Sequence, residues 1–417
     1  MKFERSQSQI LRQRLEEFPR FMIVVAGPRQ VGKTTLVRQV LQGYAGFFVA
    51  ADQPLERSSL PSEGQVSLVA SIGNDGNAST AQWLIQCWTR ARAMARTLRD
   101  GQRFVLAIDE IQKVPRWSEI VKGLWDADRA AALNLHVVLL GSSPWLMQQG
   151  LSESLAGRYE LIPMGHWSYT EVQTAFDFSL DEYLYFGGYP GGAALIQDES
   201  RWRSYVRGAL IHPNIEKDIL QMVRVDKPAL LKNLFELGCS YSGQIISYTK
   251  LMGQLQDAGN TVTLAHYLDL LSRAGLLSGL SKYAGKQHRQ RASSPKLNVL
   301  NTALISALSG YDFAAARADR SHWGRLVESA VGAHLCNTAY DNCRVQYWRE
   351  SPDEVDFIVS DGDRLLAIEV KSGATAMTPR GLGVFTGKYR HARQLVVGTG
   401  GIALPEFLAY PARHWLE

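Results

Sequence analysis

The chain has 417 residues, of which 46% are hydrophobic and 20% are charged. This balance is that of a packed globular protein and argues against long disordered or low-complexity stretches, and the length predicts two or three domains. The formal net charge of +5, from 45 Lys and Arg against 40 Asp and Glu, permits a nucleic-acid partner without requiring one.

The four cysteines form no CxxC pair and have no histidine at zinc-ligand spacing, which argues against a metal knuckle or a disulfide framework. The charged N-terminal segment and the shortness of the apolar runs predict neither a signal peptide nor a membrane anchor. We therefore expect a cytoplasmic protein without a membrane partner.

Short β-branched runs alternate with helical stretches through residues 1–168. This alternation predicts a parallel sheet covered by helices, with a helix over 81–98 leading into the third strand. The expected strands are 21–26, 47–50, 104–108, 135–140 and 159–162.

Three further segments follow. Residues 169–241 are helical in pattern and predict a lid or linker. In 242–310, two short helices precede two strand-like pieces, a pattern typical of a winged helix; the pieces are 248–255, 262–274, 276–283 and 296–300. Residues 320–417 predict a small α/β domain, with strands at 344–348, 354–359, 365–371 and 394–398.

The most specific motif follows the first strand, where residues 27–35 read GPRQVGKTT and match GxxxxGK[ST]. Glycines and backbone N–H groups at the start of a helix can surround a phosphate, Lys33 can reach the outer phosphates, and Thr34 can ligate Mg²⁺. The sequence therefore predicts a site for ATP and Mg²⁺. Its residues are Gly27, Pro28, Arg29, Gln30, Val31, Gly32, Lys33, Thr34 and Thr35.

Polar residues end two further strands of the predicted sheet. Asp109 and Glu110 follow the strand 104–108, at the edge where ligands of α/β proteins bind. There Asp109 would hold Mg²⁺, and Glu110 would orient or deprotonate the attacking water. Ser142 follows the strand 135–140, where a sensor of the γ-phosphate would lie, although a helix N-cap explains this serine equally well.

Four motifs in order, GPRQVGKTT, IDEIQ at 108–112, GSS at 141–143 and LAGR at 155–158, resemble a small bacterial and archaeal branch of the AAA+ ATPase superfamily. The resemblance implies ATP hydrolysis and a homo-oligomer in which Arg158 completes a neighbouring subunit's site as an arginine finger. A structural salt bridge is the alternative interpretation of Arg158.

Between the two strand-like pieces of the winged-helix pattern, the chain contains many cations and no acidic residue. Such a hairpin can neutralise DNA phosphates. Because the preceding helix has few side chains that could read base edges, we expect DNA contact without sequence preference. A solvated loop and a protein-binding surface are the alternatives. The region resembles the winged-helix region of uncharacterised function that accompanies this ATPase branch. The predicted DNA-binding residues are Lys282, Lys286, Arg289, Arg291 and Lys296.

Residues 320–417 contain Glu328 on a helix, Asp356 on a strand, and Glu369 and Lys371 at the end of the next strand. Carboxylates that converge on one site can hold Mg²⁺, and a lysine two residues on lies on the same strand face. The set resembles the PD-(D/E)XK nuclease superfamily, which implies a restriction-endonuclease-like fold, four catalytic residues, and Asp356 and Glu369 as metal ligands. An edge-strand ion pair and a fold kept only for DNA binding are the alternatives.

These features favour an ATP-hydrolysing, DNA-binding protein of DNA processing or repair, with a possible metal-dependent nuclease. The alternative is a nucleotide-controlled signalling or defence switch, in which the winged helix binds a protein partner and the nuclease-like domain is inactive.

Overall fold

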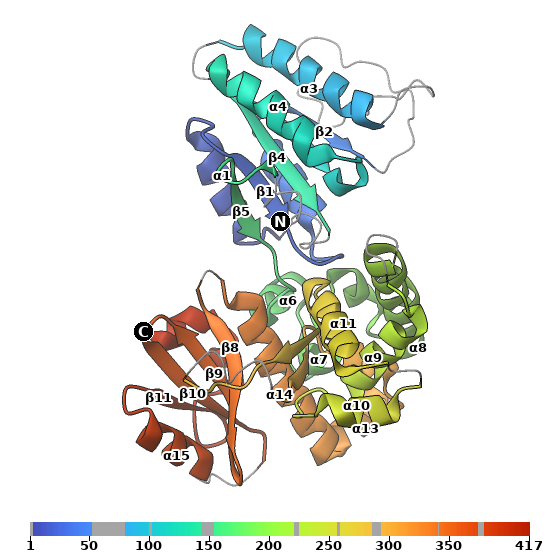
Figure 1. Cartoon of the computed structure of the whole chain (residues 1–417), viewed down its shortest axis with the longest axis vertical. Helices are drawn as coiled ribbons and strands as arrows, with labels where there is room; N and C mark the ends of the chain where they lie inside the picture. The colour runs from blue at the N-terminus through green and yellow to red at the C-terminus, as the bar shows by residue number, and fades with distance from the viewer. Residues whose placement is uncertain are drawn as a thin grey trace. The chain divides into compact units, whose positions relative to one another are not determined.

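The computed structural model describes residues 3–51, 80–99, 102–142, 154–220, 225–256, 259–285, 293–340, 342–373 and 379–417. The chain divides into two compact units, Met1–Met164 and Gly165–Glu417 (Figure 1).

The first unit contains a five-stranded sheet with the strand order β2-β3-β4-β1-β5. All four pairings are parallel, which confirms the predicted parallel sheet. The strands are β1 Met22–Ala26, β2 Ala45–Ala50, β3 Phe104–Asp109, β4 Leu135–Gly141 and β5 Tyr159–Pro163.

Helices cover both faces of this sheet, because successive residues of a buried strand point to opposite sides. On one face, α1 (Gln7–Glu16) and α2 (Lys33–Leu41) bury their leucines against Val25 and its equivalents on β3 and β4. On the other face lie α3 (Thr80–Thr97) and α4 (Trp117–Ala130) (Figure 1). These helices bury Trp88 and Trp125. With both faces covered, the carboxyl edge of the sheet is left for a ligand.

The second unit contains a mixed sheet with the order β11-β10-β9-β8, in which β10 and β11 are parallel and the other pairs are antiparallel. A separate antiparallel pair is formed by β6 and β7. The strands are β6 Leu277–Leu280, β7 Lys296–Val299, β8 Arg344–Glu350, β9 Asp353–Asp361, β10 Arg364–Lys371 and β11 Arg393–Gly398.

The rest of the second unit is mainly helical. The α-helices are α6 Tyr169–Phe176, α7 Leu180–Phe186, α8 Glu199–Tyr205, α9 Pro228–Ser240, α10 Tyr248–Gln254, α11 Thr261–Arg273, α12 Ala303–Leu308, α13 Phe313–Ala318, α14 Arg320–Thr338, α15 Arg380–Lys388 and α16 Leu404–Phe407.

The segment directly after β6 pairs with the mixed sheet. The backbone N–H of Tyr283 donates to the carbonyl of Tyr347 on β8 at 2.7 Å, and the N–H of Tyr347 donates to the carbonyl of Ser281 at 3.1 Å. The ring of Tyr283 packs edge-on against Phe385 of α15. The predicted DNA-binding residues Lys286, Arg289 and Arg291 lie outside the described residues.

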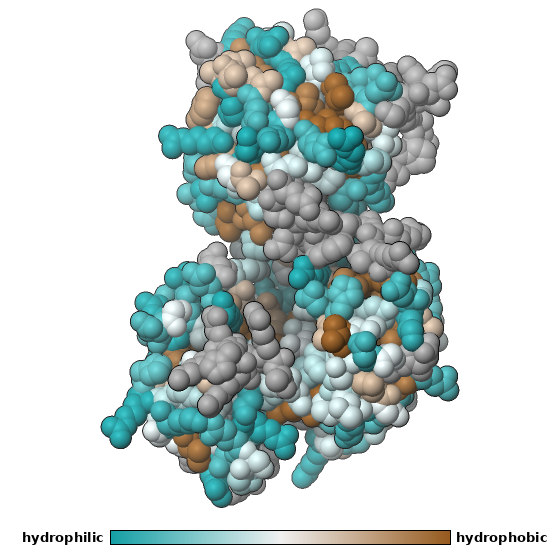
Figure 2. Space-filling model, viewed as in Figure 1, coloured by the Kyte–Doolittle hydropathy of each residue, from teal (hydrophilic) through white to brown (hydrophobic). Residues whose placement is uncertain are grey.

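One hydrophobic core extends through the second unit, from Tyr169 in its first helix to Leu416 near its end. The segments predicted as linker, winged helix and nuclease-like domain all contribute to it. On the visible face, hydrophobic residues form small separate patches among hydrophilic ones (Figure 2). Within the described ranges, no helix combines the length and apolar character needed to span a bilayer.

Candidate active sites

The predicted phosphate-binding loop connects β1 to α2 in the first unit. Gly27 follows β1 where a side chain has no room, since an added Cβ would lie 2.0 Å from the carbonyl oxygen of Met164. Gly32 precedes the helix with a φ of 91°, in the left-handed region that favours glycine. Both glycines therefore shape a tight loop that presents the N-terminus of α2, where anions bind.

Lys33 is the first residue of α2, and its side chain is buried beneath the loop. Its ammonium donates to the carbonyl oxygens of Gly27 at 2.8 Å and Pro28 at 2.7 Å. The lysine is therefore held at the loop, and we expect phosphate oxygens to replace these carbonyls when a nucleotide binds.

Thr34 and Asp109 meet at the carboxyl edge of the sheet. The Thr34 hydroxyl donates to Asp109 Oδ2 at 2.6 Å, and Asp109 is 7% exposed. A hydroxyl and a carboxylate oxygen side by side suit Mg²⁺, which prefers oxygen ligands and completes its shell with water and substrate phosphates. These residues thus fit the predicted ion, which would be held by Thr34 and Asp109 and would supply positive charge against the transferred phosphoryl group.

Glu110 lies beside Asp109 in a left-handed backbone conformation, with φ of 51°. Its Oε2 accepts hydrogen bonds from the Ser142 hydroxyl at 2.9 Å and from the side-chain amide of Gln112. The structure therefore brings the predicted base and the predicted sensor into direct contact. Gln112 was not among the predicted site residues, although it lies in the quoted IDEIQ motif two residues after Glu110.

Arg158 precedes β5 and forms a double contact with Asp126 of α4, with Nε–Oδ1 at 2.8 Å and Nη2–Oδ2 at 3.0 Å. Its side chain is 32% exposed. The salt bridge that the sequence left as an alternative is thus present within the first unit, and the pairing lowers the pKa of Asp126.

The second site lies in the mixed sheet and on α14 of the second unit. We call Glu328, Asp356 and Glu369 the C-terminal acid cluster. The backbone N–H of Val370 donates to Asp356 Oδ2 at 2.9 Å, and Lys371 Nζ lies 2.6 Å from Glu369 Oε1. Glu328 is linked to Asp356 through the ammonium of Lys296, so the four residues predicted from the nuclease resemblance lie in one region.

Lys296 also belongs to this site, which corrects the prediction that it contacts DNA from the hairpin. Its side chain is 0% exposed, and its ammonium lies 2.6 Å from Glu328 Oε1 and 3.3 Å from Asp356 Oδ1. A buried side chain cannot reach a DNA phosphate. No signal in the sequence indicates this burial, because Leu297 and Val299 lie on the strand face opposite Lys296 and alternation would leave the lysine exposed.

Burial dominates the electrostatics of the C-terminal acid cluster. It raises the pKa of Glu328 to about 7, with a further increase from Asp356 and an opposing effect of Lys296. Burial, and then the nearby Asp356, also raise the pKa of Glu369. Carboxylates so arranged need a cation to stay ionised together.

The cluster does not fit the divalent ion implied by the nuclease resemblance. Lys296 occupies the space between Glu328 and Asp356, and Lys371 pairs with Glu369. Among residues with assigned structure, no three His, Cys, Asp or Glu side chains are grouped closely enough to hold a metal ion. The buried Glu369 Oε2 has no hydrogen-bond partner in the described part of the chain.

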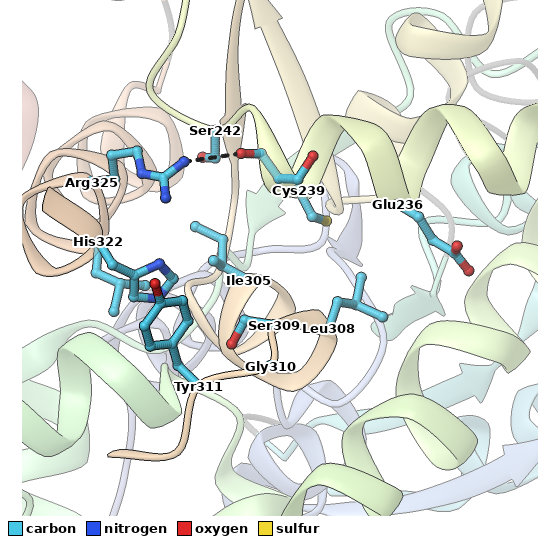
Figure 3. Close-up of a pocket in the computed structure, with 12 residues that line it drawn as sticks. Glu236, Cys239, Ser242, Ile305, Leu308, Ser309, Gly310, Tyr311, His322 and Arg325 are labelled. Carbon is cyan, nitrogen blue, oxygen red and sulfur yellow. Dashed lines mark hydrogen bonds between the residues drawn. The ribbon is translucent and has the colours of Figure 1, made fainter. Parts of the chain in front are cut away.

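A cavity of about 330 Å³ lies elsewhere in the second unit, between α9, α12 and α14 (Figure 3). The ring of Tyr311 stacks on His322 at 4.3 Å between centroids, and Arg325 reaches the Ser240 carbonyl at 3.4 Å. None of the predicted site residues lines this cavity.

The parallel sheet, the phosphate-binding loop and the Thr34–Asp109 pair define the first unit as a P-loop ATPase domain. Comparison with known families agrees, since residues 19–173 match the AAA domain family. The first unit is therefore an AAA-family ATPase domain. Residues 177–314 and 323–412 match two domains of unknown function, DUF8612 and DUF4143.

Over 377 residues the chain is 26% identical to an uncharacterized protein of Mycobacterium tuberculosis, covering 89% of this chain and 74% of that protein. A protein of Mycobacterium bovis gives the same values. Among solved structures, a Walker-type ATPase of Pyrococcus abyssi matches 73% of this chain and 95% of its own, at 16% identity and a TM-score of 0.48.

Proposed function

We propose that this protein is an ATP-hydrolysing, DNA-binding protein whose ATPase activity responds to DNA. The contact between the Thr34 hydroxyl and Asp109 carries the first half of this proposal, because it preassembles two ligands for the Mg²⁺ of a nucleotide. Glu110, held by Ser142 at the same edge, is the residue proposed to orient the attacking water.

The second half rests on the charge of the hairpin segment. Residues 281–292 contain five basic or histidine side chains and no Asp or Glu: Lys282, Lys286, His288, Arg289 and Arg291. A segment that carries positive charge and no negative charge attracts the DNA phosphate backbone whatever the base sequence. The proposed partner is therefore DNA bound without sequence preference.

Steady-state ATP hydrolysis with single-stranded, duplex and branched DNA tests the proposal, with Lys33→Ala as the inactive control. We expect one DNA form to increase the rate at least several-fold, and that form identifies the substrate. Equal rates with all forms and without DNA would contradict a DNA-responsive ATPase.

Charge reversal at Arg289 and Arg291 tests the hairpin itself. DNA affinity should fall, and the dependence of log K on log salt should become less steep, because each lost phosphate contact removes about one released counterion. Arg344→Glu with Arg393→Glu is the matched control, since both side chains are exposed on the same unit and the total charge change is equal. A salt slope unchanged by the hairpin variant would remove this segment from the DNA interface.

A second candidate is a nucleotide-controlled switch in which the second unit binds a protein and does not cleave DNA. The Lys296 ammonium within the C-terminal acid cluster favours this candidate, because it argues against a metal nuclease. ATP hydrolysis that ignores DNA but accelerates with a purified protein partner would support the switch.

A further inference from the structure

The C-terminal acid cluster contains a cation that the chain itself supplies. We propose that the Lys296 ammonium takes the place of a divalent metal ion, so that the cluster binds no catalytic metal and the second unit does not hydrolyse phosphodiesters. This inference stands or falls independently of the ATPase activity and its response to DNA.

The Lys296 ammonium contacts three oxygen atoms, two through hydrogen bonds to Asp356 and one through an ion pair with Glu328. They are Glu328 Oε1 at 2.6 Å, Asp356 Oδ1 at 3.3 Å and the Asp356 carbonyl oxygen at 3.1 Å. A Mg²⁺ ion would have to lie about 2.0–2.1 Å from the same carboxylate oxygens. The ammonium and the metal ion therefore cannot occupy the space together.

The remaining carboxylate oxygens of the two predicted metal ligands are also largely engaged. Asp356 Oδ2 accepts from the backbone of Val370, and Glu369 Oε1 is paired with Lys371. That leaves Glu369 Oε2 as the one of these four oxygens without a donor from the described residues. A single protein oxygen is a poor site for a divalent cation.

The charges of the site agree with this count. The three carboxylates of the cluster and the ammonium groups of Lys296 and Lys371 leave a formal charge of −1 when all are ionised, and the neighbouring Glu354 pairs with Arg349. A divalent ion added to this arrangement would reverse the sign to +1. The attraction that normally draws a metal into a carboxylate cluster is therefore mostly satisfied by the protein.

Lys296 is also fixed in place by its backbone and its surroundings. It opens β7, pairs with Leu280 of β6, and forms a bridge with Ile245. Its ammonium lies 4.8 Å from the centre of the Phe357 ring. Strand pairing therefore fixes the backbone of Lys296, and burial among the carboxylates and Phe357 favours the observed place of its ammonium.

Counting bound Mn²⁺ in the full chain, by the loss of the free-ion EPR signal, gives the first test. The wild type and Glu369→Gln should bind equal numbers of ions, since the ATPase domain contributes the same to both. One additional ion in the wild type would overturn the proposal. Plasmid nicking that needs Mg²⁺ or Mn²⁺ and is lost in Glu369→Gln would also overturn it.

Replacing the lysine gives the second test. Lys296→Met leaves Glu328 and Asp356 without their cation at nearly unchanged volume, so this variant should bind one more Mn²⁺ per chain than the wild type. Lys296→Met with Glu369→Gln should lose that ion. A folded Lys296→Met chain with no additional ion would contradict the role given to Lys296. If Lys296→Met does not fold, the number of Mn²⁺ ions bound by the wild type and by Glu369→Gln still tests whether the cluster binds a metal ion.

Discussion

The Thr34 hydroxyl of α2 donates a 2.6 Å hydrogen bond to Asp109 Oδ2 at the end of β3, and so joins the phosphate-binding loop to the neighbouring acidic pair. Residues 75 positions apart in the chain are thereby placed at one edge of the parallel sheet. The ligands proposed for Mg²⁺ are in contact before any nucleotide binds, which lowers the entropic cost of assembling the site.

Removing either member of this pair should abolish hydrolysis. We expect Thr34→Ala and Asp109→Asn to lower kcat for Mg-ATP at least a hundredfold, because the ion that neutralises the transferred phosphoryl group loses a ligand. Thr97→Ala, at the exposed end of α3, is the matched control and should retain the wild-type rate. A steady-state phosphate-release assay measures both, and full activity in Asp109→Asn would refute the assignment.

Glu110→Gln should separate nucleotide binding from turnover. The amide keeps the contact with the Ser142 hydroxyl but cannot accept a proton, so kcat should fall by about 10²–10⁴ while ATP affinity stays within a few-fold of the wild type. Ser142→Ala should have a smaller effect, because it removes an orienting contact. Fluorescent-nucleotide titration with single-turnover hydrolysis distinguishes the two, and an equal loss of binding in Glu110→Gln would contradict the role in catalysis.

Arg158 already forms a salt bridge with Asp126. The arginine-finger hypothesis therefore needs a test that distinguishes a role in a neighbouring subunit's site from this structural role. Arg158→Ala chains should be inactive alone but regain activity when mixed with Lys33→Ala chains, since each supplies what the other lacks. Asp126→Asn breaks only the salt bridge and should remain active. Mixtures without recovered activity, or an active Arg158→Ala chain, would leave Arg158 as a structural residue.

Acidic pH should destabilise the first unit through His136 of β4. Burial, with added repulsion from Arg103 and Arg129 and a smaller opposing effect of Glu16, lowers the pKa of this 2% exposed side chain to about 4. In the unfolded chain its pKa is near 6.5, so protonation favours unfolding, and stability present above pH 6.5 declines as the pH falls towards 4. The loss from this group is about 3 kcal/mol.

Hydrogen exchange of the β4 amides as a function of pH measures this effect in the full chain. His136→Asn removes the titrating group and should flatten the pH dependence between 6.5 and 4 in these amides. His391→Asn, an exposed position in the second unit, is the control and should leave it unchanged. An unaltered pH profile in His136→Asn would contradict the assignment.

The parallel sheet could be predicted from sequence, and so could the convergence of the residues proposed for the ATP site, because both depend on short stretches of chain. The strand before Gly27 and the acidic pair after Phe104–Ile108 place their residues at the same sheet edge whatever the loops do. The alternation of residues in β9 and β10 likewise brought Asp356 and Glu369 together.

The contacts of Lys296 could not be predicted in the same way. Asp356 is 60 residues away, and its pairing with Lys296 depends on how β7 packs against α14 and β9. A lysine in a charge-rich segment is ordinarily solvated, and only tertiary packing shows that this one is buried. Gln112 was missed because its contact with Glu110 depends on the short helical turn Ile111–Lys113 that follows β3.

The pairing of the segment after β6 with Tyr347 of β8 also determines how this protein can be dissected. A fragment that ends near residue 310 would expose the surfaces that β8 and α14 cover. A fragment that begins at residue 320 would lack Lys296 and leave Glu328 and Asp356 without their cation. Truncations at these points should yield insoluble or unfolded products, so the boundary for expressing separate parts lies between Met164 and Gly165.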